Sequence, residues 1–293
     1  MGDFFSFDLL TATLRFSAPL IFAAMGGLLC ERAGVMNIAL EGFMLVGAFS
    51  AAAGTYYAET PFVGLLVGMA AAMLAATVHA FWCVTLRGDQ IVAGTAINLL
   101  GLGIPAFLLQ RIWGTPGGSP QVERLPSIGA GLNVLVPVAF VLVPIVHYVI
   151  YRTRAGLRIQ AAGEHPRAAA SVGIDVVRYR YACVIASGAL AGLGGAYLSI
   201  GDLSQYTNNM AAGRGFIAIA AVIFGNWTPF GTLGATLLFG AAQATRVQVQ
   251  ALGLDIAPDL IGALPYLLTL IAITGLVRRS DPPAGLGRHA AAE

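Results

Sequence analysis

The chain has 293 residues, of which 57% are hydrophobic and only 10% are charged, and its mean hydropathy is +0.79. Soluble domains carry about 25% charged residues, so this composition excludes an ordinary soluble protein. The formal net charge of +2 is too small and too dispersed to indicate nucleic-acid binding.

All sixteen basic residues are arginine, and the chain contains no lysine. A phosphate-binding P-loop requires a lysine that reaches the β- and γ-phosphates of the nucleotide. Any ATP hydrolysis linked to this protein must therefore take place on another polypeptide, and the chain is not expected to be an enzyme. The three cysteines stand singly, without the spacing of metal ligands or redox pairs, so neither a metal site nor a cofactor is expected.

Charged residues bracket a series of uncharged runs that reach, or nearly reach, the roughly 20 apolar residues of a membrane-spanning helix. In chain order, the predicted spans lie near residues 8–30, 37–57, 61–86, 90–110, 133–151, 180–200, 215–226, 230–248 and 259–277. These runs predict an all-α polytopic membrane protein with about eight to ten transmembrane helices. No separate soluble domain is visible, so residues 1–293 are expected to form a single transmembrane domain.

Four polar residues interrupt the apolar sequence between the first two runs: Glu31, Arg32, Asn37 and Glu41. An ionisable group at membrane depth costs on the order of a few kcal/mol unless it is paired or hydrated, so these residues need a role. Glu31 and Arg32 either pair with each other in a short turn or serve the function. Glu41 should enter the bilayer facing protein or water. Gly34 and Gly42 would permit an unwound segment around Asn37 whose backbone groups could contact a solute.

The predicted span at residues 90–110 carries several polar side chains on one helix, namely Gln90, Thr95 and Asn98. Together with Asn37 and Glu41, Gln90 and Asn98 are the residues expected to line a pathway for a polar solute. The other polar residues inside apolar runs stand singly, and interhelical hydrogen bonds are the expected role for them.

Residues 152–180 form an arginine-rich loop, which the excess of positive charge in short cytoplasmic loops assigns to the cytoplasm. Residues 111–132 are rich in glycine and proline, and they are expected to form an irregular external loop. Inside the arginine-rich loop, alanines favour helix, whereas Gly163 and Pro166 force a turn between two short helices. This shape suits docking into the groove of a partner protein, although an amphipathic loop lying on lipid headgroups would have the same sequence.

The stretch from residue 215 to 245 is too long for one helix and too short for two comfortable ones. The sequence Asn226-Trp-Thr-Pro-Phe-Gly231 interrupts it, so a broken or re-entrant helix is predicted. Small residues recur at spacings of three and four within residues 188–195 and 231–235. Such faces allow helix backbones to approach closely, and helix packing is their predicted role.

Three segments resemble permease subunits of ATP-binding-cassette importers, in the branch that handles nucleosides. The first is Glu31-Arg-Ala-Gly-Val-Met-Asn-Ile-Ala-Leu-Glu-Gly42. The second is Gly163-Glu-His-Pro-Arg-Ala-Ala-Ala-Ser-Val-Gly-Ile174, with His165 where asparagine is usual. The third is Arg214-Gly-Phe-Ile-Ala-Ile-Ala-Ala-Val-Ile-Phe-Gly225, followed by Trp227 and Pro229. The order of the segments and their spread over most of the chain make the resemblance specific.

The resemblance implies the architecture of a type II importer permease, located as a multi-pass protein in the cell inner (cytoplasmic) membrane. It implies a complex with ATPase subunits, a second related permease and an extracytoplasmic substrate-binding protein. The ATPases would press on a coupling segment at Gly163, Glu164, His165, Pro166 and Arg167. Nucleosides are the solute it implies most readily, with simple sugars or branched-chain amino acids as the alternative.

Two other classes of protein are compatible with a polytopic composition. An ion-coupled secondary transporter would use Glu41 and His79 as proton or sodium sites and would need no partner. An intramembrane enzyme would need a catalytic constellation, whereas the candidate His and Asp residues are isolated. The arginine-rich loop and the three matched segments favour the importer.

Overall fold

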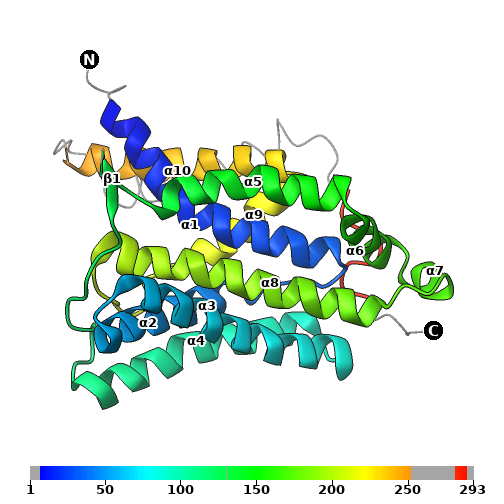
Figure 1. Cartoon of the computed structure of the whole chain (residues 1–293), viewed down its shortest axis with the longest axis horizontal. Helices are drawn as coiled ribbons and strands as arrows, with labels where there is room; N and C mark the ends of the chain where they lie inside the picture. The colour runs from blue at the N-terminus through cyan, green and yellow to red at the C-terminus, as the bar shows by residue number, and fades with distance from the viewer. Residues whose placement is uncertain (1–6, 130, 252–280, 289–293) are drawn as a thin grey trace.

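The computed structural model describes residues 7–129, 131–251 and 281–288 (Figure 1). Its α-helices are α1 (Phe7–Arg32), α2 (Leu40–Ala58), α3 (Pro61–Ala80), α4 (Gln90–Trp113), α5 (Leu135–Arg152), α6 (Arg154–Glu164), α7 (Pro166–Ser171), α8 (Val176–Ala196), α9 (Arg214–Phe224) and α10 (Pro229–Ala251). The π-helical turns η2 (Phe81–Thr85) and η3 (Tyr197–Leu203) continue α3 and α8. Strands β1 (Ser127–Gly129) and β2 (Leu132–Asn133) form a small antiparallel pair.

Each span predicted between residues 8 and 248 coincides with a helix, so the all-α polytopic prediction is confirmed. Within the described residues, five helical stretches are long and apolar enough to cross a membrane: Phe7–Arg32, Pro61–Thr85, Gln90–Trp113, Leu135–Arg152 and Val176–Leu203. The span predicted near residues 259–277 lies outside the described residues. The total of eight to ten crossings therefore stays a prediction.

Local side-chain and backbone signals fix several helix ends. Asp89 caps α4 by accepting hydrogen bonds from Ile91 N (2.8 Å) and Val92 N (3.0 Å). The helix ends at Gly114, whose φ of +67° is left-handed, so the irregular loop begins there rather than at residue 111. Asp175 accepts from Arg178 N (3.0 Å) and starts α8 about one turn before the predicted span.

The bundle is built around α1 and α8, which lie side by side in its middle (Figure 1). Helices α2, α3 and α4 pack on one side of this pair, and α5, α9 and α10 pack on the other. Most of the residues of α1 and α8 are buried, whereas α3, α4 and α5 expose broad apolar faces. Such faces are what lipid, or a neighbouring membrane subunit, would cover.

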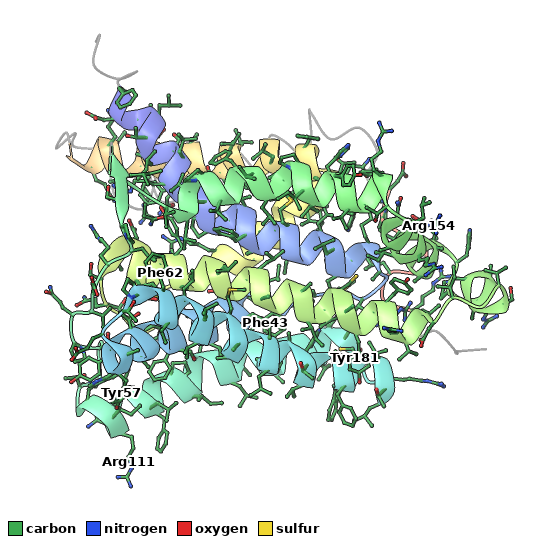
Figure 2. All side chains as sticks on the ribbon, viewed as in Figure 1. Phe43, Tyr57, Phe62, Arg111, Arg154 and Tyr181 are labelled. Atoms are coloured by element: carbon green, nitrogen blue, oxygen red, sulfur yellow. The ribbon has the colours of Figure 1, made fainter. Side chains whose placement is uncertain are left out.

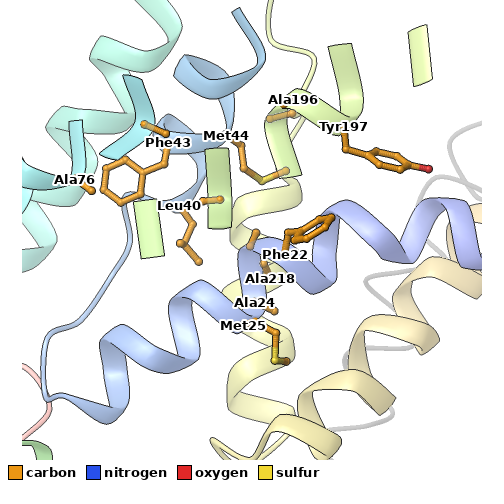
Figure 3. Packing of buried hydrophobic residues seen from close by; sticks show 14 of the residues in the cluster. Phe22, Ala24, Met25, Leu40, Phe43, Met44, Ala76, Ala196, Tyr197 and Ala218 are labelled. Carbon is orange, nitrogen blue, oxygen red and sulfur yellow. The ribbon is translucent and has the colours of Figure 1, made fainter. Parts of the chain in front are cut away.

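The core contains a few large apolar side chains among many small ones. Phe22, Met25, Leu40, Phe43 and Met44 pack between α1, α2 and their neighbours (Figure 3).

Elsewhere helix backbones touch directly. A Cβ on Gly47 would lie 2.5 Å from Gly192 Cα, and a Cβ on Gly101 would lie 2.7 Å from Gly42 Cα. The packing role predicted for the small residues at 188–195 is thus confirmed.

The two ends of the bundle differ in composition. Arg154, on α6, and Arg111, near the end of α4, mark opposite ends (Figure 2). Helices α6 and α7 project at one end, which we call the arginine-rich end, and β1 lies at the other (Figure 1). The irregular loop at residues 114–134 therefore lies far from the arginine-rich loop, as their opposite predicted locations require.

Candidate functional site

The chain does not pass directly from α1 into α2. Residues 33–39 are non-helical and mostly buried, and we call them the first break. Gly34 has a φ of +87°, a left-handed conformation that glycine adopts without strain. It is also closely packed, since a Cβ there would lie 2.9 Å from Arg180 Nη2 and 3.2 Å from Gly163 Cα. The unwound segment predicted around Asn37 is present.

Two side chains of α4 satisfy the backbone of the first break. Gln90 Oε1 accepts a hydrogen bond from Met36 N at 2.7 Å. Asn98 Nδ2 donates to Ile38 O at 2.8 Å, and its Oδ1 accepts from Gly42 N at 2.7 Å. Because the break lacks helical hydrogen bonds, its buried N–H and C=O groups need these partners. Two of the predicted pathway residues thus meet at the break.

Asn37 is fully buried in the first break and is bound to α8. Its Nδ2 donates to Ser187 Oγ at 2.6 Å. Two amide atoms beside the break, Asn37 Oδ1 and Gln90 Nε2, have no hydrogen-bond partner among the described residues. The break therefore holds one free acceptor and one free donor, and a buried polar atom of this kind calls for a ligand, a water or a rearrangement.

Residues 204–213, between η3 and α9, form a second irregular stretch, which we call the second break. Its backbone is left-handed at Ser204, Asn209 and Ala212, and at Gly213, which precedes α9. Main-chain hydrogen bonds attach it to the loop at residues 114–134: Ser119 N donates to Tyr206 O (2.9 Å), and Val122 N donates to Ser204 O (2.8 Å). The loop thus fixes the path of the second break.

Glu41 connects the two breaks. Its carboxylate accepts from Gly213 N (Oε1, 2.8 Å) and from Gly215 N (Oε2, 2.6 Å), at the start of α9. The first N–H groups of a helix have no partner within it and carry partial positive charge, so a carboxylate is a favourable cap. At Gly215 a Cβ would lie 2.5 Å from Glu41 Cα, which leaves space only for glycine.

Helix α9 has only 11 residues, which is too short to cross a bilayer alone. A turn at residues 225–228 separates it from α10. The interruption predicted in this stretch is therefore a real break, with α9 beginning at the Glu41 carboxylate.

Glu31 and Arg32 bind a common partner rather than each other, so the alternative of a mutual pair is wrong. Glu31 Oε2 accepts from Trp227 Nε1 at 2.5 Å, and Arg32 Nε donates to Trp227 O at 2.8 Å. Arg32 Nη2 also donates to Tyr151 Oη at 3.3 Å. Trp227 and Asn226 both have a φ of +50°, so this turn is conformationally strained and held in place.

The predicted coupling residues form the turn between α6 and α7. His165 joins the two helices, and Pro166 occupies the first turn of α7, as expected for a two-helix loop. His165 and Arg167 are exposed, whereas Gly163 is buried against the end of α1. A Cβ on Gly163 would collide with the carbonyl oxygen of Arg32. The turn therefore touches the residue that precedes the first break.

Glu164 adds a longer-range link at the same place. Its Oε1 lies 4.0 Å from Arg32 Nη1, which makes an ion pair at the limit of contact. Since the Glu164 side chain is 41% exposed, this pair contributes at most about 1 kcal/mol. The backbone contact at Gly163 is thus the stronger mechanical connection between α6 and α1.

A groove of about 560 Å³ lies beside this turn, between α6 and the start of α8. Its lining comprises Arg158, Val172, Gly173, Ile174, Asp175, Arg178, Tyr179 and Ala182. The hydrogen bond from Arg158 Nη1 to Tyr179 Oη (3.1 Å) raises the pKa of the guanidinium, which stays charged. With two arginines and one carboxylate, the groove carries net positive charge.

The structure thus places Asn37, Gln90 and Asn98 at the first break and Glu41 directly after it, and the predicted coupling turn packs against the end of α1 where that break begins. Sequence reasoning missed Trp227 and Ser187 as partners of these residues. Trp227 lies in the interruption at residues 226–231, and that interruption was the sequence signal that could have identified it. Among the described residues, no group of three or more His, Cys, Asp or Glu side chains could hold a metal ion.

Comparisons with known proteins match nearly the whole chain. The family described as "Branched-chain amino acid transport system / permease component" matches residues 9–273. The guanosine ABC transporter permease protein NupQ of Bacillus subtilis is 38% identical over 94% of both chains. The nucleoside ABC transporter permease protein NupC of Lactococcus lactis is 34% identical over 94% of this chain and 93% of its own. The putative glucose ABC transporter permease protein TsgC13 of Haloferax volcanii is 35% identical over 94% of both.

Proposed function

Because this chain belongs to the family of branched-chain amino acid transport system permease components, we propose that it is the membrane subunit of an ATP-driven importer of nucleosides. The observation that supports nucleosides as the solute is the 38% identity of this chain, over 94% of both chains, to a protein named as a guanosine permease. A second relative named for nucleosides supports the same solute. Simple sugars are the alternative, favoured by the relative named for glucose.

The absence of lysine supports the division of labour in the complex. Without a P-loop lysine this chain cannot supply the nucleotide site, so separate ATPase subunits hydrolyse ATP. A second, related permease completes the pore, and an extracytoplasmic binding protein delivers the solute. We propose that the chain is a single transmembrane permease domain in the inner membrane, with its arginine-rich end in the cytoplasm.

The first break is the proposed point of contact with the solute. Asn37 Oδ1 and Gln90 Nε2 offer an acceptor and a donor, the pair of groups that the edge of a nucleobase can bind. Asn98 and Glu41 hold the backbone on either side in position. When the bundle rearranges during transport, these amides would become accessible from the pore.

The turn at residues 163–167 is the proposed contact with the ATPase, with the positive groove beside it receiving acidic side chains. Movement of this turn would pass through the contact between Gly163 and Arg32 to the end of α1. Because the first break starts there, pressure from the closing ATPases would reach the solute-binding amides. By alternating access, this motion would open the pathway inward and release the solute.

The test is co-expression with the partner subunits, purification in mild detergent, and reconstitution with the binding protein. We expect an ATPase to co-purify. Its rate of ATP hydrolysis should rise when guanosine or another nucleoside is added, and the labelled nucleoside should be taken up. If glucose rather than a nucleoside stimulated ATP hydrolysis, the proposed solute would be a simple sugar. Uptake by this chain alone, driven by an ion gradient, would contradict the importer.

A Gly163→Ala variant tests the coupling turn. The added Cβ collides with the carbonyl oxygen of Arg32, so the contact between α6 and α1 must open. We expect uptake to fall at least tenfold while the protein still reaches the membrane. Gly103→Ala is the matched control, because a Cβ at Gly103 meets nothing within 4 Å. Equal uptake by the two variants would show that Gly163 has no role in coupling.

A further inference from the structure

Residues 281–288, Asp-Pro-Pro-Ala-Gly-Leu-Gly-Arg, lie on the arginine-rich end as a short segment that turns at residues 284–287, and we call it the strap. They follow the part of the chain that the permease family matches, which stops at residue 273. Pro283 and Gly285 are buried, although they belong to no helix or strand. The strap therefore lies on the surface and is anchored there by these two buried residues.

The strap binds the coupling turn through its backbone. Gly285 N donates to Gly163 O at 2.8 Å, and Ala284 N donates to Glu164 Oε2 at 3.0 Å. The fit at Gly285 is tight, since a Cβ there would lie 2.6 Å from Gly163 O and 3.2 Å from Pro166 Cδ. Only glycine can occupy this position without moving the turn.

The same eight residues reach the first break. Gly287 N donates to Gly34 O at 3.2 Å, at the left-handed residue where the break turns. Arg180 of α8 lies beneath this contact and is only 1% exposed. Its Nε donates to Ala33 O (3.2 Å), and its Nη1 donates to Arg288 O (2.8 Å). One buried guanidinium thus joins the strap to the break.

A third contact lies at the start of the strap. Asp281 N donates to Asn226 Oδ1 at 2.9 Å, in the turn between α9 and α10 that Glu31 and Arg32 hold through Trp227. The strap therefore bonds to the coupling turn, the first break and the turn after α9. These are the three segments that carried the resemblance to importer permeases.

We propose that the strap locks these three segments into one mechanical unit, so that displacement of the coupling turn moves the first break and the α9–α10 turn together. This inference rests on the proposed function, since it assumes that an ATPase pushes the coupling turn. The two prolines limit the conformations of the free strap, which lowers the entropy lost when it binds. Without the strap, the coupling turn would keep its contacts with Arg32 and Gly34, but it would lose the hydrogen bonds from Ala284 N and Gly285 N.

Two variants test the strap in the assembled complex. The first ends the chain after Ser280, and the second is Gly285→Val, which forces the strap off the coupling turn. Ala284→Val is the matched control, because Ala284 bonds through its main chain and its side chain is exposed. We expect both test variants to assemble and hydrolyse ATP, with solute imported per ATP lowered at least fivefold. We expect the control to equal the wild type.

Hydrogen–deuterium exchange of the same complexes gives a readout that does not depend on the identity of the solute. Loss of the strap should speed amide exchange at least fivefold in residues 156–170 and also in residues 33–39. Faster exchange in the coupling turn alone, or unchanged exchange and unchanged solute per ATP, would overturn the proposal. If the wild-type complex imports no nucleoside, the proposed function fails, and joint faster exchange of both segments still supports the strap.

Discussion

Both breaks are non-helical stretches that lead into a helix, but different kinds of hydrogen bond hold them. The first break is buried; Gln90 and Asn98 of α4 satisfy its backbone, and Ser187 of α8 accepts a hydrogen bond from the Asn37 side chain. The second break is held mainly by main-chain hydrogen bonds to the loop at residues 114–134. Glu41 belongs to the helix after the first break and caps the helix after the second.

This difference separates what depends on side chains from what depends on the path of the chain. A break that is held by buried amides can be disrupted by a single substitution, because each lost partner leaves a backbone group unsatisfied. A break held by main-chain bonds tolerates most substitutions, since the bonding groups are present in every residue except proline. Substitutions that loosen the first break should therefore have the larger effects.

The largest effect is expected for Asn98→Ala. The variant leaves Ile38 O and Gly42 N without partners inside the protein, which should destabilise it by about 3 kcal/mol. The measurement is the thermal unfolding midpoint in detergent, together with nucleoside uptake. Thr95→Ala is the control on the same helix, because Thr95 is exposed and bonds only to its own helix at Ile91 O. Equal midpoints would mean that the first break does not depend on Asn98.

Glu41→Gln should come next, because this residue serves both breaks. The amide keeps one acceptor oxygen but turns a donor NH₂ group toward the N-terminus of α9, at a loss of about 1–3 kcal/mol. Uptake should fall more than in Glu59→Gln, which changes an exposed carboxylate at the end of α2. Matching uptake in the two variants would remove Glu41 from the pathway.

A smaller effect is expected at the second break from Ser119→Ala. The variant removes the Oγ that accepts from Tyr206 N at 2.9 Å, but the main-chain bond from Ser119 N remains. A loss of about 1 kcal/mol should be visible as a lower unfolding midpoint. Ser127→Ala, in the exposed part of the same loop, is the control. A loss as large as that of Asn98→Ala would erase the contrast between the breaks.

The smallest effect is expected for Arg15→Ala. Arg15 Nη2 lies 2.6 Å from Asp202 Oδ1, near the second break, with side-chain exposures of 41% and 24%. Pairs this accessible to solvent contribute about 0–1 kcal/mol, and salt weakens them. A double-mutant cycle with Asp202→Ala, measured at low and high salt, gives the coupling energy. A coupling that is large and insensitive to salt would place this pair among the supports of the fold.

The sequence alone predicted the helices well, because charge spacing marks the limits of apolar runs that must fit a bilayer. It also selected residues that meet in space: Gln90 and Asn98 are eight positions apart on one helix, so both face the first break. The polarity of Asn37 and Glu41 inside apolar sequence was a local signal of the same kind.

What could not be predicted depends on contacts between distant parts of the chain. Glu31 and Trp227 are 196 positions apart, and nothing near Glu31 distinguishes a tryptophan partner from the neighbouring Arg32. The strap binds through backbone groups, which every sequence possesses, so its residues carry no pattern that points to Gly163 or Gly34. Only its glycine and proline content was visible, and that content is equally typical of an unattached tail.

The glycine contacts between helices have a consequence for sequence variation among relatives. Where Gly47 meets Gly192, and where Gly42 meets Gly101, one main chain rests on another. Ordinary core contacts can drift by paired exchange, in which one side chain grows while its neighbour shrinks. Here neither glycine has a side chain that could become smaller, so no second substitution can compensate for the first. Such positions should therefore leave no covariation signal, and contact prediction from alignments should be blind where the helices lie closest.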